Sequence, residues 1–205
     1  MLDKKEERKK RVREAIKQAA LEIAESEGWH KVTIRRVADK VLYTPPIVYE
    51  FFKNKDDLYR HIVKDGFELL INSTYEKINA QHSAEDKLCA LALARFEFVT
   101  KHNTLHHMMF DADNPEWHNL ELSNYMIKIK GMVLGLLTEI TGEEDEVKVQ
   151  EYFLNMVCLL KGYTFFKMHD NKNIIAKRKS MLLPDMEVTD LFLAAFKRFI
   201  NSIKS

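Results

Sequence analysis

Apolar residues recur at spacings of three and four along most of this 205-residue chain. In residues 5–27, Ile16, Ala20 and Ile23 lie on one helical face and charged residues cover the other, which predicts an amphipathic helix. Comparable runs predict further helices over about 56–79, 83–101, 105–110, 115–140, 147–168 and after Pro184. With two short helices starting near residues 34 and 45, the pattern predicts an all-α fold of about nine helices.

The two short helices follow the first long one and are joined by a tight turn. Thr33 can cap the helix over 34–40, because a threonine hydroxyl accepts a hydrogen bond from a free backbone N–H. Thr44 can cap the next, which places Pro45 and Pro46 in a first turn where their missing N–H groups would be unpaired anyway. Two short helices, the second of about two turns, and a turn within about 20 residues predict a helix-turn-helix.

Charge is distributed unevenly along the chain. Residues 1–60 hold 15 Lys and Arg against 11 Asp and Glu, a net charge of +4, whereas the other 145 hold 17 against 20, a net charge of −3. A basic N-terminal region favours binding of a polyanion there, and an ordinary solvated surface is the alternative. The sequence has no secretory signal pattern and no apolar run of about 18 residues, so we expect a cytoplasmic protein that makes no membrane contact.

Nine side chains in and around the helix-turn-helix are candidates for DNA contacts. Hydroxyl groups and basic side chains can bind phosphates, and hydroxyl or apolar groups on the second helix can contact base edges and thymine methyls. The candidates are Thr33, Arg35, Arg36, Tyr43, Thr44, Ile47, Tyr49, Lys53 and Lys55. Alternatively, Arg35 and Arg36 are solvated surface charges, and Tyr49, like Phe52, packs inside the small domain.

Residues 15–58 resemble the DNA-binding domain of the Tet repressor family. The matching features are Ala19-Ala20, Ile23, Gly28, Trp29, Thr33-Ile34, Val37-Ala38 and the run VYEFFKNKDDL over 48–58. At the turn, Val41-Leu42 stand where the family usually has Ala-Gly. The resemblance implies phosphate contacts for Thr33, Tyr49 and Lys55, and places Thr44, Pro45 and Ile47 opposite bases.

The resemblance also implies how the chain is organised. Residues 1–57 would be the helix-turn-helix DNA-binding domain, and residues 58–205 a helical ligand-binding and dimerisation domain. Each subunit would bind a small-molecule effector, and a homodimer would form through the last two helices. The apolar stripes of those two helices suit a four-helix interface, although an intramolecular core would use them as well.

Bulky and flexible side chains on the central helices are candidates for the effector pocket. They are Phe96, Thr100, Met109, Phe110, Trp117, Tyr125, Met126, Met156 and Phe166. Methionine and aromatic walls suit a mostly apolar ligand, although each residue can equally be core. No metal is expected at His102, His106 and His107, because a helix break at Asn103 would separate the first from the others.

The sequence therefore predicts a transcriptional regulator, with no cofactor. It would act as a repressor that a ligand releases from a near-palindromic operator. The alternative is a helical protein-interaction adaptor that keeps the helix-turn-helix shell without binding DNA, an interpretation that Pro45-Pro46 and Leu42 favour. An enzyme is not expected, since no phosphate-binding glycine loop, nucleophile elbow or zinc-protease motif occurs.

Overall fold

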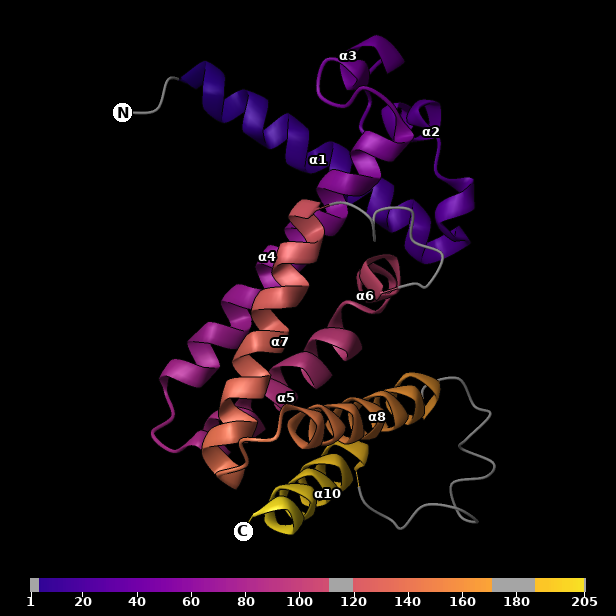
Figure 1. Ribbon diagram of the computed structural model, residues 1–205. Coiled ribbons are helices and arrows are strands. Elements are labelled where there is room, and N and C mark those ends of the chain that lie inside the picture. The colour runs from indigo at the N-terminus through magenta and orange to yellow at the C-terminus, as the bar shows by residue number, and fades with distance from the viewer. Residues whose placement is uncertain (1–3, 111–119, 171–186, 205) are drawn as a thin grey trace. The chain divides into compact units, whose positions relative to one another are not determined.

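The computed structural model describes residues 4–110, 120–170 and 187–204 (Figure 1). Those residues form nine α-helices and one short 3-10 helix, with no strand among them, so the predicted all-α class is confirmed. The chain divides into two compact units. Unit 1 is residues 1–67 with 104–116, and unit 2 is residues 68–103 with 117–205.

Unit 1 contains the helix-turn-helix. Its elements are α1 (Lys4–Glu27), the 3-10 helix η1 (Trp29–Lys31), α2 (Ile34–Lys40), α3 (Pro45–Tyr49), the first part of α4 (Lys55–Asn79) and α6 (Asn103–Phe110). Small residues on α1, among them Ala19, Ala20 and Ala24, are buried and let neighbouring backbones approach closely. Gly28 ends α1 with a φ of +88°, a conformation that L side chains rarely adopt.

Helix α6 packs within unit 1 against α4. A side chain at Gly66 would meet Met109 Sδ at 2.7 Å and Leu105 Cδ1 at 2.9 Å, so the missing Cβ allows the close approach. The buried Tyr59 hydroxyl donates to the Met108 carbonyl oxygen at 2.6 Å. Met109 is thus a core residue of unit 1.

Unit 2 is built around aromatic rings. Its elements are the last part of α4, α5 (Ala84–Lys101), α7 (Leu120–Thr141), α8 (Glu146–Asp170) and α10 (Val188–Ile203). Phe96 on α5 stacks on Phe192 of α10 with ring centroids 4.6 Å apart, and Phe196 packs beside Phe192. Helix α5 ends at Lys101 with His102 in a non-helical conformation, one residue before the expected break at Asn103.

Candidate functional site

The turn between α2 and α3 depends on an unusual leucine conformation. Leu42 has a φ of +58°, and it is the one non-glycine residue with positive φ in the described ranges. This conformation lets the N–H of Leu42 bond to the Asp39 oxygen at 3.2 Å and the N–H of Tyr43 bond to the Ala38 oxygen at 2.9 Å. Those bonds close the end of α2, as a glycine does in many helices.

Helix α3 starts as predicted but is shorter than expected. Thr44 is its N-cap residue, although its side chain makes no capping hydrogen bond, and Pro45 and Pro46 occupy the first turn. The helix ends at Tyr49, after about one turn instead of about two. The N–H of Phe52 bonds to the Val48 oxygen at 3.0 Å, and both side chains are buried. The buried pair fixes α3 against unit 1 and leaves its opposite face outward.

Half of the ten DNA-contact candidates, the nine side chains together with Pro45, are exposed in this structure. Thr33, Arg35, Thr44, Tyr49 and Lys53 are exposed, while Arg36, Tyr43, Pro45, Ile47 and Lys55 are partly buried. Thr33 caps α2, because its hydroxyl oxygen accepts from the Arg36 N–H at 3.2 Å. Tyr49 is 51% exposed, which disagrees with the alternative that it packs inside the domain.

The two adjacent arginines of α2 have different surroundings. Arg36 forms a two-pronged ion pair with Glu27 and donates to the Lys31 carbonyl oxygen at 3.1 Å. The hydrogen bond from Arg36 lowers the pKa of Glu27 and raises that of Arg36 itself. Arg35 points outward and pairs with no side chain of the described residues. Arg36 is therefore tied to the fold, whereas Arg35 is open to a partner.

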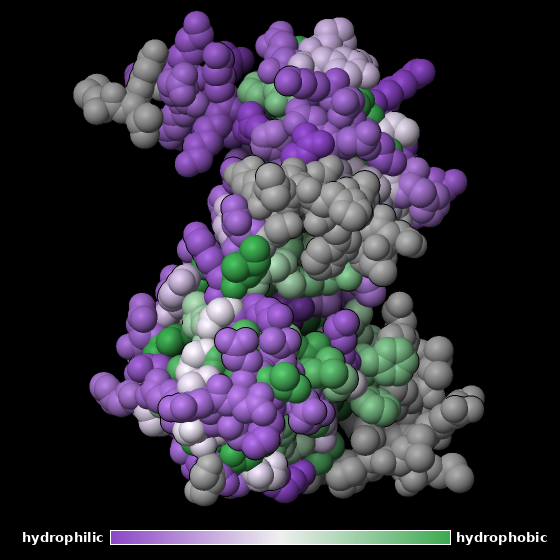
Figure 2. Space-filling view, in the orientation of Figure 1, coloured by the Kyte–Doolittle hydropathy of each residue, from purple (hydrophilic) through white to green (hydrophobic). Residues whose placement is uncertain are grey.

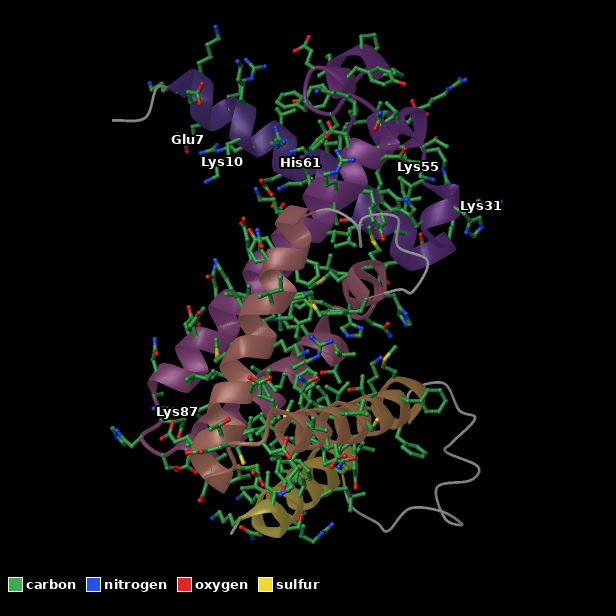
Figure 3. The ribbon with its side chains drawn as sticks, in the orientation of Figure 1. Glu7, Lys10, Lys31, Lys55, His61 and Lys87 are labelled. Carbon is green, nitrogen blue, oxygen red and sulfur yellow. The ribbon has the colours of Figure 1, made fainter. Side chains whose placement is uncertain are left out.

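The two lysines after α3 also differ. The Lys55 ammonium donates to the Trp29 carbonyl oxygen at 2.9 Å and lies 5.3 Å from the centre of the Trp29 ring. Partial burial lowers its pKa, and Figure 3 labels it near the start of α4. Lys53 is exposed, and its backbone N–H donates to Asp57 Oδ2 at 2.9 Å. In this conformation Lys55 holds η1 against α4, and Lys53 presents its charge to solvent.

The N-terminal turns of α1 add basic residues that the candidate set omitted. Residues 4–11 are exposed on all sides, and the first buried residue of the helix is Ile16. Six of those eight exposed residues are basic: Lys4, Lys5, Arg8, Lys9, Lys10 and Arg11. Figure 3 shows Lys10 projecting from these turns, and the same segment is purple, meaning hydrophilic, in Figure 2. The run of positive charge in the sequence could have identified them.

The effector-pocket candidates do not gather at one place. Phe96 and Met156 are core residues of unit 2, whereas Met109 and Phe110 belong to unit 1. Thr100 and Phe166 are exposed, and Tyr125 and Met126 are partly buried. The Tyr125 hydroxyl donates to Glu68 Oε1 at 3.0 Å. Trp117 lies outside the described residues, and so does the loop around 171–186.

A hollow at the connection between α7 and α8 contains none of those candidates. It is lined by Leu134, Gly135, Thr138, Glu143, Glu144, Glu146, Val149 and Gln150. Its acidic rim does not suit an anionic ligand.

Sequence reasoning missed Arg95 on α5, whose burial lowers its pKa to about 10. Arg95 is partly buried and lies between the buried Ala94 and Phe96 in the sequence of α5.

Among the residues that the structure describes, neither the histidines nor the helices form a second kind of site. His102 packs against Phe98 in unit 2 with ring centroids 5.0 Å apart, and His106 packs against Phe110 in unit 1 at 4.8 Å. Across the described ranges, no three His, Cys, Asp or Glu side chains gather to hold a metal ion. None of the helices in those ranges is long and apolar enough to cross a bilayer.

Comparison with known proteins places the helix-turn-helix in a family. Residues 16–62 match the family model described as bacterial regulatory proteins, tetR family. The HTH-type transcriptional activator FasR of Mycolicibacterium smegmatis is 22% identical over 95 residues, which cover 46% of this chain and 43% of that protein. A fatty acid metabolism regulator protein of Bacillus subtilis is 25% identical over 87 residues, which cover 42% and 45%. The matched segments thus span less than half of either relative.

A solved structure matches almost the whole chain. The transcriptional regulator FadR from Bacillus subtilis, in complex with stearoyl-CoA, superposes with a TM-score of 0.65 at 19% identity. The match covers 92% of this chain and 98% of that one. At that identity the likeness establishes the fold, including the helical body that follows the helix-turn-helix. The family model describes regulatory proteins, in agreement with the prediction that the chain is not an enzyme.

Proposed function

Because the chain belongs to the tetR family of bacterial regulatory proteins, we propose that it regulates transcription by binding an operator through α3. One observation carries the proposal. Val48 and Phe52 bury one side of the α3 region, so that Thr44 and Tyr49 face outward from the helix that a helix-turn-helix inserts into the major groove. Arg35 and Lys53 are exposed on either side of it in sequence and supply phosphate contacts.

The chemistry of α3 favours apolar and shape readout of the operator. Pro45 and Pro46 have no backbone N–H, and Ile47 carries no hydrogen-bonding group. Tyr49 and Thr44 retain hydroxyls that can reach a phosphate or a base edge. The operator should therefore contain thymines whose methyl groups face α3, and few positions read by two hydrogen bonds.

The deciding experiment measures binding of the full chain to DNA from immediately upstream of its own gene, across a salt series. Tight binding that weakens steeply with salt supports the proposal, since phosphate contacts release counterions. Tyr49→Ala should reduce the affinity about tenfold or more. Tyr75→Ala is the matched control, because Tyr75 is exposed to a similar degree, 44%, but lies on α4 in unit 2.

A negative result has a defined meaning. If neither that DNA nor any sequence from a random-site selection binds more tightly than competitor DNA, the adaptor interpretation replaces the regulator. Equal loss of binding in Tyr49→Ala and Tyr75→Ala would instead show that the Tyr49 effect is not local to α3.

The active form would be a homodimer that pairs through α8 and α10. On α8, Val147, Leu154 and Phe165 are exposed although apolar, with Cys158 between them. Green, hydrophobic residues are visible over this part of unit 2 in Figure 2. A two-fold pair of such faces would bury them and present two α3 helices to the half-sites of a near-palindromic operator.

The effector would be a small, mostly apolar molecule bound in unit 2. Support comes from the likeness to a regulator solved with stearoyl-CoA. The direct test adds stearoyl-CoA, stearate or free coenzyme A to the protein–operator complex. Release by the acyl thioester at concentrations where coenzyme A has no effect would support an acyl-chain sensor.

Ligand binding would favour a subunit arrangement with unsuitable spacing between the two α3 helices, so that operator affinity falls. Repression is the mode that follows from occupying a promoter. A cytoplasmic location follows from the need to reach chromosomal DNA. If no member of a broad effector panel changes operator affinity, the sensing half of the proposal is wrong while the DNA-binding half remains.

A further inference from the structure

Leu42 is costly to the fold in two independent ways. Its φ of +58° brings its Cβ close to the following carbonyl oxygen, a clash that glycine avoids. Its side chain is also 91% exposed, the highest value among the exposed large hydrophobic residues that the structure describes. The side chain therefore gives unit 1 no buried contact in return for the strained backbone. Strain of this kind is typical of residues retained for function.

The surroundings of Leu42 indicate what it contacts. It lies two residues before Thr44, the N-cap residue of α3, and the exposed side chains of Thr44, Pro46 and Tyr49 are all uncharged. Charged residues of both signs border this uncharged region in the sequence, with Lys40 before it and Glu50 and Lys53 after it. Lys40 is paired with Glu22 at 3.0 Å, whereas Lys53 is exposed. An exposed apolar tip next to an uncharged reading helix suits the major groove, where thymine methyls lie between rows of phosphates.

We propose that Leu42 is a specificity-determining residue of the operator contact, whose side chain packs against a thymine methyl at the edge of each half-site. The inference rests on the proposed DNA binding and extends it to a turn residue. An apolar contact from Leu42 fits the poor hydrogen-bonding capacity of α3, because the thymine methyl is the apolar group that distinguishes a base pair in the major groove. A protein partner is the competing occupant, and the experiment below separates the two.

The experiment uses the full chain and an operator obtained by random-site selection. Thymines are replaced one at a time by uracil, which lacks the methyl group. For the wild type, one uracil position in each half-site should weaken binding about threefold to tenfold, the value of a lost apolar contact. Leu42→Gly should weaken binding to the unmodified operator by a similar factor and no longer respond to uracil at that position. Leu42→Met, which keeps an apolar side chain of similar reach, should retain the uracil response.

Thermal unfolding distinguishes contact from folding. Leu42→Gly relieves the strained backbone, so its Tm should rise while its operator affinity falls. A misfolded variant would lose both. If Leu42→Gly binds as tightly as the wild type with the same uracil profile, Leu42 makes no base contact, and the inference is overturned while DNA binding stands. If the wild type binds no operator at all, the proposed function fails first, and the exposed leucine is assigned to a protein partner.

Discussion

The helix-turn-helix of unit 1 and the helical body of unit 2 are stabilised by different side chains. Around α1, α2 and α3 the buried residues are mostly Ala, Val and Ile, with Phe52 as a large ring. Around α5, α8 and α10 the centre is a group of stacked and tilted rings, Phe96, Phe192 and Phe196. Small side chains keep backbones close, so backbone features such as caps and turns set the geometry in unit 1. In unit 2 the shapes of large side chains set it.

This difference bears on how each unit can perform its function. In unit 1, the outward residues of α3 are fixed by local signals: a threonine N-cap residue, two prolines and a left-handed turn. In unit 2, the outward residues of α8 are defined by which side of the helix the rings of the core cover. A local change should therefore alter unit 1 mainly through its backbone, and unit 2 mainly through its packing.

The largest effect should come from removing a ring of unit 2. Phe192→Ala deletes a fully buried side chain that touches Phe96, Phe196 and Tyr163. We expect the free energy of unfolding to fall by about 3–5 kcal/mol, the cost of lost burial plus a cavity. Chemical denaturation measures it. Ile127→Ala, at an exposed site on α7, should change it by less than about 0.5 kcal/mol. Equal effects would show that aromatic packing does not define unit 2.

The next effect concerns the outward face of α8. Leu154 is 60% exposed, and Leu154→Asp would place a charge in the proposed dimer interface. Burying an unpaired carboxylate is costly, so the dimer dissociation constant should rise more than about tenfold. Sedimentation equilibrium measures the change. Ile127→Asp, a charge at an equally exposed apolar site on α7, is the control, and dimers that persist in both variants would place the interface elsewhere.

A smaller effect should follow from the basic turns of α1. Lys9→Gln combined with Lys10→Gln removes two exposed charges from unit 1. If both contact phosphates, the slope of log affinity against log salt should become shallower by about 2, with about threefold to tenfold weaker binding at low salt. The matched control is Lys101→Gln with Lys128→Gln in unit 2. An unchanged slope in the Lys9 and Lys10 variant would exclude α1 from the DNA contact.

The smallest effect tests whether backbone conformation sets the geometry of unit 1. Leu42→Gly should stabilise the protein by about 0.5–1 kcal/mol, because the relief of a left-handed leucine exceeds the added flexibility of glycine in the unfolded chain. Leu69→Gly, at an exposed position inside α4, should instead destabilise by about 1 kcal/mol. Calorimetry of both variants shows whether each substitution raises or lowers the stability of the protein. If both substitutions changed the stability in the same direction, the strained conformation of Leu42 would be contradicted.

The sequence alone predicted much of the local structure of unit 1. The cap at Thr33, the prolines at the start of α3 and the burial of Phe52 all follow from interactions within a few residues. Sequence also identified Leu42 as the departure from the family turn. It could not show that Arg36 pairs with Glu27 or that Lys55 binds the Trp29 carbonyl, because those partners are 9 and 26 residues away.

In unit 2 the sequence determined the helices but not their inner and outer faces. Apolar residues surround most of α8, and the stripe that contains Met156 is buried in the core whereas Leu154, on another side, is exposed. The candidate pocket residues were chosen by type, and the tertiary structure distributed them among two cores and the surface. Side-chain type and local backbone preference are properties of the sequence. Which apolar face is covered is decided only when distant helices meet, because burial depends on the whole set of neighbours.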